Sequence, residues 1–141
     1  MPTSADLLLD TSAAIPLLLQ DHRTHAVVTA QVRGRRLGLA GHANHETYSV
    51  LTRLPPDYRL SPPVARRALR VNFPHTVFLT ETEQAEALDR LAAAGVAGGA
   101  VYDALVGLAA LAHGLPLLTA DRRAAGTYAR LGVAVEPVSV E

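Results

Sequence analysis

The sequence lacks several residue types, and each absence narrows the chemistry that is open to the protein. None of the 141 residues is cysteine, which excludes disulfides, zinc–thiolate sites, iron–sulfur clusters and cysteine nucleophiles. Lysine is also absent, because all thirteen basic residues are arginine. Schiff-base chemistry and the phosphate-binding lysine of a P-loop are therefore excluded as well. A chain without cysteine suits a reducing compartment, so we expect a cytoplasmic location.

Long apolar runs and aromatic residues are also scarce. No apolar stretch approaches the roughly 18 to 20 residues that span a bilayer, and no basic residue precedes the first leucines. We therefore expect neither a membrane segment nor a secretory leader. Aromatic residues make up only 4% of the chain, against 49% hydrophobic residues in total, so leucine, valine and alanine must form the core. The length predicts one domain over residues 1–141.

Net charge is zero, so no overall positive field attracts nucleic acid. Local clusters of arginine are the alternative, and we interpret them first as solvated helix faces. The clusters are Arg33, Arg35 and Arg36, and Arg66, Arg67 and Arg70.

The order of the expected elements predicts the fold class. Short apolar runs with abrupt polar ends indicate buried strands, and apolar residues at three- and four-residue spacing indicate helices. Strands and helices alternate, which predicts a parallel sheet covered on both faces and joined by right-handed crossovers. Strands are expected at 6–10, 37–40, 76–79, 115–118 and 133–135, and helices at 13–19, 22–35, 42–54, from 61 onward, 82–93, 100–113 and 121–128.

Four acids are expected at one edge of this sheet. Asp10 ends the first strand and Asp121 lies just past the fourth, while Glu46 and Asp103 lie in first turns of helices. Ligands of open parallel sheets bind beyond the carboxyl ends of the strands. Each acid also has a structural explanation: Asp10 and Asp121 as helix caps, Glu46 and Asp103 as partners of helix dipoles. Asp103 lies on a helix that is apolar on nearly every side, so we expect its carboxylate to be partly buried.

Four carboxylates in one cleft repel one another and raise each other's pKa values, and a divalent cation relieves that repulsion. Hard oxygen ligands select Mg²⁺ or Mn²⁺, whose bound water can attack a phosphodiester. The hydroxyls of Thr11, Ser12 and Thr119 lie beside these acids. They are expected to hydrogen-bond to the acids or to a phosphate, or else to serve only as caps.

The six histidines show no zinc-binding spacing. His42 and His45 are three residues apart, without the partners of a known motif. We interpret them as residues at a helix start or at the rim of the site, with contact to RNA as the lesser alternative.

Four segments together resemble the PIN-domain family, and within it the VapC-type toxins of bacterial toxin–antitoxin pairs. They are LLLDTS at 7–12, HETYSVLTRL at 45–54, GGAVYDALV at 98–106 and LLTADRR at 117–123. The segments occur in order over nearly the whole chain, so the resemblance is stronger than any one of them would be alone.

The resemblance implies a three-layer α/β/α sandwich with a central parallel sheet, and an Mg²⁺- or Mn²⁺-dependent endoribonuclease acting on structured RNA such as tRNA or rRNA. It assigns the acidic roles, catalytic and metal-binding, to Asp10, Glu46, Asp103 and Asp121. It assigns the hydroxyl of the fourth motif to Thr119. It also implies a VapB-type antitoxin as partner, and a homodimer or a toxin–antitoxin hetero-oligomer, for which the apolar faces of the early helices are candidate surfaces.

One departure and three alternatives remain. Some relatives carry a further acid shortly after the fourth motif, where this chain has arginines and alanines at 122–125, so the number of metal ions is open. A phosphatase of the haloacid-dehalogenase type is the first alternative, but it needs a second aspartate where this chain has Ser12 and a lysine that this chain lacks. A receiver-type signalling domain also needs lysine. A non-catalytic PIN-like module that binds RNA or protein gains little from clustered acids.

Overall fold

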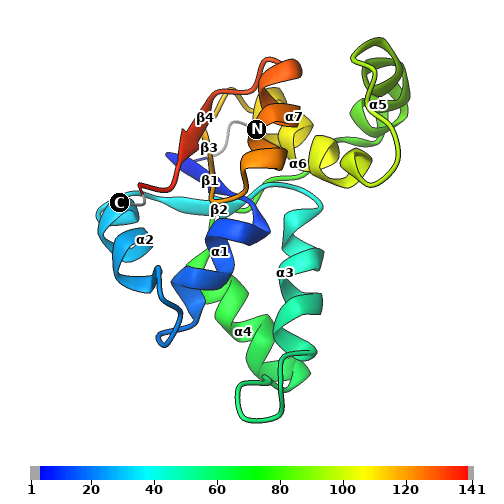
Figure 1. Ribbon diagram of the computed structural model, residues 1–141. Coiled ribbons are helices and arrows are strands. Elements are labelled where there is room, and N and C mark those ends of the chain that lie inside the picture. The colour runs from blue at the N-terminus through cyan, green and yellow to red at the C-terminus, as the bar shows by residue number, and fades with distance from the viewer. Residues whose placement is uncertain (1–3, 140–141) are drawn as a thin grey trace.

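Four short strands form a wholly parallel sheet in the order β2-β1-β3-β4. The structure is a computed structural model that describes residues 4–139, shown in Figure 1. The strands are β1 (Leu7–Leu9), β2 (Leu37–Leu39), β3 (Leu117–Thr119) and β4 (Val135–Pro137). Leucines make up five of the six residues of the two central strands, which is typical of a parallel sheet buried on both faces.

Helices follow the strands and connect them. The helices are α1 (Thr11–Leu18), α2 (His25–Val32), α3 (Ala43–Thr52), α4 (Pro62–Asn72), α5 (Glu81–Ala93), α6 (Ala100–Ala112) and α7 (Arg122–Arg130). Within residues 4–139, none of these helices has both the length and the apolar character needed to cross a membrane.

Side chains that alternate along the strands build two cores, one on each face of the sheet. Leu8 and Leu117 face the core formed mainly by α5, α6 and α7. Leu7, Leu9 and Leu118 face the core formed by α1, α2, α3 and α4. Figure 1 shows these two groups of helices on opposite sides of the strands. The predicted three-layer α/β/α sandwich with a central parallel sheet is confirmed.

The expected strand at 76–79 is wrong, because this segment contributes only an isolated parallel bridge between Ala40 and Val77. The hydroxyl of Thr76 accepts a hydrogen bond from the backbone N–H of Leu39 at 3.0 Å and donates to the carbonyl of Phe73 at 3.0 Å. A side chain thus takes the place that a backbone carbonyl would fill in a strand, and the ladder does not extend.

Several predicted boundaries move because of turns that the sequence pattern did not resolve. The helix expected at 22–35 is shorter and covers only α2, His25–Val32. It begins late because the His22 ring accepts the N–H of Thr24 at 3.2 Å in a turn, and it ends before Gly34, whose φ is 76°. The strand expected at 115–118 begins at Leu117, after Pro116, and the strand expected at 133–135 begins at its last residue.

Gly38 is required at the centre of β2 by the close passage of the segment around His75. An ideal Cβ on Gly38 would overlap the backbone carbonyl of His75. We expect Gly38→Ala to push this segment from the sheet and to lower the free energy of unfolding by about 1–3 kcal/mol, measured by urea denaturation.

Gly126→Ala is the matched control, because nothing lies within 4 Å of the Cβ it would carry in α7. This control should stabilise the protein by up to about 1 kcal/mol through helix propensity. Equal effects of the two substitutions would contradict the argument.

Candidate active site

The site lies where β1 and β3 end side by side. The two strands pair in parallel with Leu9 opposite Leu118, and the N–H of Asp10 continues the ladder to the carbonyl of Leu118 at 3.2 Å. Asp10 therefore leaves the sheet at the same level as Thr119, the last residue of β3. The expectation that these two strands deliver their polar ends to one edge is confirmed.

Asp10 is held by hydrogen bonds to both of its carboxylate oxygens. It is only 4% exposed. Its Oδ1 accepts the hydroxyl of Ser12 at 2.6 Å and the backbone N–H of Ala13 at 3.2 Å, and its Oδ2 accepts the phenol of Tyr128 at 2.8 Å. Burial raises the pKa of Asp10, and the hydrogen bonds oppose that rise. Asp10 is thus the N-cap of α1 and also the most enclosed acid of the site.

Hydroxyl groups connect Asp10 with the residues after β3. The Oγ of Ser12 accepts the N–H of Ala120 at 2.9 Å and lies 3.2 Å from the Oγ1 of Thr119. Thr119 in turn accepts the backbone N–H of Asp121 at 3.1 Å. The expected contacts of Ser12 and Thr119 with the neighbouring acids therefore occur, through a side chain for Asp10 and through the backbone for Asp121.

Asp121 is exposed and caps α7. Its Oδ1 accepts the backbone N–H groups of Arg123 at 2.9 Å and Ala124 at 3.2 Å. Its Oδ2 accepts no hydrogen bond from any residue between 4 and 139. The capping prediction is confirmed for this residue, and capping uses only one of its two carboxylate oxygens.

Glu46 and Asp103 enter from helices rather than from strand ends. Both lie in first turns, Glu46 in α3 and Asp103 in α6, and both are partly buried. Burial raises the pKa of the Asp103 carboxyl, and the negative charges of Asp121, Glu46 and Asp10 raise it further, in that order. The structure therefore brings the four predicted acids close enough to act on one another.

No basic side chain neutralises this cluster within residues 4–139. The two salt bridges of this part of the chain join Arg35 to Glu136 and Arg36 to Asp6, each at 2.8 Å, so two of the three arginines in the first cluster are already paired. Among the same residues, no three histidine, aspartate or glutamate side chains are close enough together to hold a metal ion. The donor set nevertheless fits Mg²⁺ or Mn²⁺, since such ions are usually bound through one or two carboxylates and keep several waters.

Tyr128 is a residue of this site that the sequence analysis missed. Its ring is buried between α7 and α6, and a Cβ on Gly107 of α6 would lie 2.8 Å from its Cδ1. Two features of the sequence could have indicated it: a glycine inside an otherwise apolar helix, and a lone aromatic residue on an arginine-rich helix. Burial and the adjacent Asp10 carboxylate raise the pKa of the phenol, which stays protonated and donates.

Removing the phenol hydroxyl should leave one oxygen of Asp10 without its donor. We expect Tyr128→Phe to keep the ring packing against Gly107 and to lower the free energy of unfolding by about 1–3 kcal/mol, measured by urea denaturation. Tyr58→Phe, on an exposed ring, is the control that should change nothing. The loss should shrink in an Asp10→Asn background, and an undiminished loss would show that the hydrogen bond is not its cause.

The raised pKa of Asp103 has a defined effect on stability. The folded protein holds the proton of the Asp103 carboxyl more tightly than the unfolded chain does. Aspartates of an unfolded chain have a pKa of about 3.9. The contribution of Asp103 to stability is therefore largest below that pH, falls as the pH rises toward the folded-state pKa, and is then constant. We expect Asp103→Asn to melt above the parent at pH 7.5 and the difference to vanish toward pH 4, measured by thermal unfolding in EDTA. Asp57→Asn, in an exposed loop, should melt with the parent at both pH values; if it behaves like Asp103→Asn, the assignment fails.

Known proteins share both the sequence and the fold. The model of the PIN domain family matches residues 7–130. Ribonuclease VapC27 of Mycobacterium tuberculosis is 51% identical over 130 residues, covering 92% of this chain and 94% of the relative. Ribonuclease VapC40 of the same species is 44% identical over 132 residues, covering 92% and 97%.

Solved structures with lower identity show the same fold. A structure of FitAB bound to an IR36 DNA fragment matches with a TM-score of 0.74 at 17% identity, over 96% of this chain and 97% of that one. A structure of FitAcB from Neisseria gonorrhoeae matches with a TM-score of 0.70 at 18% identity, over 92% and 95%. Together with the family model and the two close relatives, these matches show that the chain belongs to the PIN-domain family and, within it, to the VapC ribonucleases.

Proposed function

We propose that this chain is the toxin of a type II toxin–antitoxin pair, an endoribonuclease that hydrolyses phosphodiester bonds of structured RNA with Mg²⁺ or Mn²⁺. The observation that carries the proposal is the electrostatics of Asp103. Burial and then three other carboxylates raise its pKa, and among the described residues no arginine pairs with any of the four acids. Such a cluster opposes folding unless a cation binds to it.

Asp10 and Asp103 are the residues that we expect to hold the cation, with Glu46 and Asp121 completing the site. A bound Mg²⁺ or Mn²⁺ supplies an activated water and neutralises charge that develops on phosphate oxygens. Because no acid follows Asp121 at 122–125, a single ion is the simpler proposal for this chain.

The other residues of the site orient the acids. Ser12 and Tyr128 fix the carboxylate of Asp10 from both of its oxygens, so its position does not need to reorganise when the charge balance of the cleft changes. Thr119 fixes the backbone of Asp121. Asp10 is buried and so largely excluded from water. Exclusion of water strengthens each electrostatic interaction that the Asp10 carboxylate makes.

The proposed partner is a VapB-type antitoxin. The acidic cleft fits a basic side chain of such a partner for the same reason that it fits a cation, because an opposite charge near the four carboxylates relieves their repulsion. A tRNA or rRNA is the proposed substrate, and a homodimer or a toxin–antitoxin hetero-oligomer is the proposed assembly.

Purified protein should cleave a fluorescently labelled structured RNA in Mn²⁺ or Mg²⁺, and EDTA should abolish cleavage. We expect Asp10→Asn and Asp103→Asn each to slow cleavage by about 100-fold or more, since a lost metal ligand removes several kcal/mol of transition-state stabilisation. Initial rates followed on denaturing gels would measure the effect.

Asp57→Asn is the control for a charge lost elsewhere and should cleave at the parental rate. Thermal unfolding of each variant checks that the fold survives. If the Asp10 and Asp103 variants cleave as fast as the parent, or if cleavage persists in EDTA, the carboxylate mechanism is wrong.

A further inference from the structure

Four rings form two contacting pairs at the start of α3, one with the start of α6 and one with the segment before α5. The rings of His42 and Tyr102 stack with centroids 5.4 Å apart at 29°. His45 lies one turn after His42 on the same side of α3, and its ring centroid is 6.2 Å from that of Phe78, at 49°. Tyr102 is 56% exposed and Phe78 is 50% exposed. We call these four residues the aromatic row.

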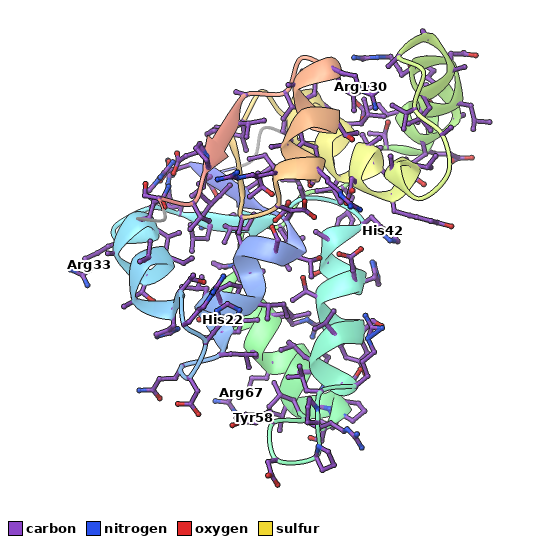
Figure 2. All side chains as sticks on the ribbon, viewed as in Figure 1. His22, Arg33, His42, Tyr58, Arg67 and Arg130 are labelled. Atoms are coloured by element: carbon purple, nitrogen blue, oxygen red, sulfur yellow. The ribbon has the colours of Figure 1, made fainter. Side chains whose placement is uncertain are left out.

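The aromatic row runs beside the acids. Tyr102 directly precedes Asp103, and His45 directly precedes Glu46. Figure 2 shows His42 at the start of α3, which is the end of that helix nearest to α6. A chain that reaches the acids along this side therefore passes the exposed ring of Tyr102.

An arginine-lined groove continues from the row, away from the acids. It lies between α3 and α4, where a pocket of about 250 Å³ has six lining residues. They are Asn44, His45, Tyr48, Arg66, Leu69 and Arg70. A neighbouring pocket, to which Phe78 contributes, shares Asn44, Leu69 and Arg70 with the first.

The two arginines of this groove are free to bind an anion. Arg66 and Arg70 are four residues apart on α4 and so lie on one face of that helix. Both are exposed, and within residues 4–139 neither forms a salt bridge or a hydrogen bond through its guanidinium. His45 connects them to the aromatic row, because it belongs to both.

We propose that the aromatic row and the Arg66–Arg70 groove form a binding track for unpaired RNA, which holds nucleotides next to the phosphate that is cut. This inference rests on the proposed ribonuclease function and adds the residues that hold the nucleotides next to the cut. Bases stack on the exposed faces of Tyr102 and Phe78, and the following phosphates meet Arg66 and Arg70. Stacking on rings together with a basic groove is the usual combination for single strands, since every base has a π-face.

The track discriminates against duplex RNA for a geometric reason. Bases inside an A-form helix are stacked on one another and present only their edges, so their faces cannot reach Tyr102 or Phe78. A loop or single-stranded end offers such faces without the cost of unpairing. The track therefore accepts unpaired nucleotides, even where the RNA as a whole is structured.

Binding by full-length Asp10→Asn protein in EDTA separates this inference from catalysis. The probes are a fluorescein-labelled single-stranded RNA of mixed sequence, the same strand annealed to its complement, and the same strand with abasic sites, all read by fluorescence anisotropy. We expect the single strand to bind best. Adding Tyr102→Ala or Phe78→Ala should weaken its binding by about 10-fold and should leave binding of the abasic strand unchanged.

The exposed ring of Tyr58, 53% exposed, provides the matched control. Figure 2 shows it at the end of the molecule remote from His42, so Tyr58→Ala should leave binding of the single strand unchanged. Arg66→Gln and Arg70→Gln should each reduce the slope of log affinity against log salt by about one. Arg33→Gln is their control and should leave that slope unaltered.

Three results would overturn the proposal while leaving the ribonuclease function intact. The first is equal weakening of the normal and abasic strands by Tyr102→Ala, and the second is preferential binding of the duplex. The third is a change in oligomeric state by Phe78→Ala on size-exclusion chromatography without a change in base dependence, which would assign the row to a contact between copies of the chain. If instead the parent binds unpaired RNA as predicted but never cleaves it with metal, the proposed function fails and the track stands.

Discussion

The parallel pairing of β1 with β3 is the constraint on which the rest of the structure depends. Because Leu9 lies opposite Leu118, Asp10 and Thr119 leave the sheet at one level, and Ser12 can touch both of them. A shift of one residue in this register would turn the leucines of one strand toward the wrong core. The two cores therefore enforce the register, and the register assembles the site. Packing and chemistry are in this sense set by the same few leucines.

The four acids differ in how the fold treats them. Asp10 is buried, but hydrogen bonds to both oxygens compensate for much of the desolvation of its charge. Asp121 stabilises the start of α7. Asp103 accepts no side-chain or backbone donor from the described part of the chain and is repelled by its neighbours. One acid is thus rigidly placed without any cation, whereas Asp103 carries an electrostatic penalty that a cation would relieve. This difference is the main reason to regard the cluster as a site rather than as a set of helix caps.

The sequence alone was sufficient for the layered fold and for the positions of the acids, because both follow from periodicity and from the rule that parallel strands share an edge. It was insufficient wherever a side chain replaced a backbone partner. Thr76 takes the N–H of Leu39 and ends the ladder that an apolar run at 76–79 predicts. Tyr128 was missed because a tyrosine among apolar residues is interpreted as part of the core, and only the geometry shows that its hydroxyl reaches the carboxylate of Asp10, directly after the first strand. The aromatic row was visible only in part: His42 and His45 are neighbours on α3, whereas Tyr102 and Phe78 are far away in sequence and meet them only through tertiary contacts.

The clearance at Gly107 ties together three positions that lie in different parts of the chain. The ring of Tyr128 reaches Asp10 because α6 has no side chain at that point. A larger residue at 107 would displace the ring, so it would be tolerated only together with a smaller residue at 128, and that pair would leave Asp10 without its phenol. The donor to Asp10 therefore depends on the empty space at 107 as much as on the tyrosine itself. The glycine in the middle of a helix thus belongs to the architecture of this site, although it contacts none of the four acids.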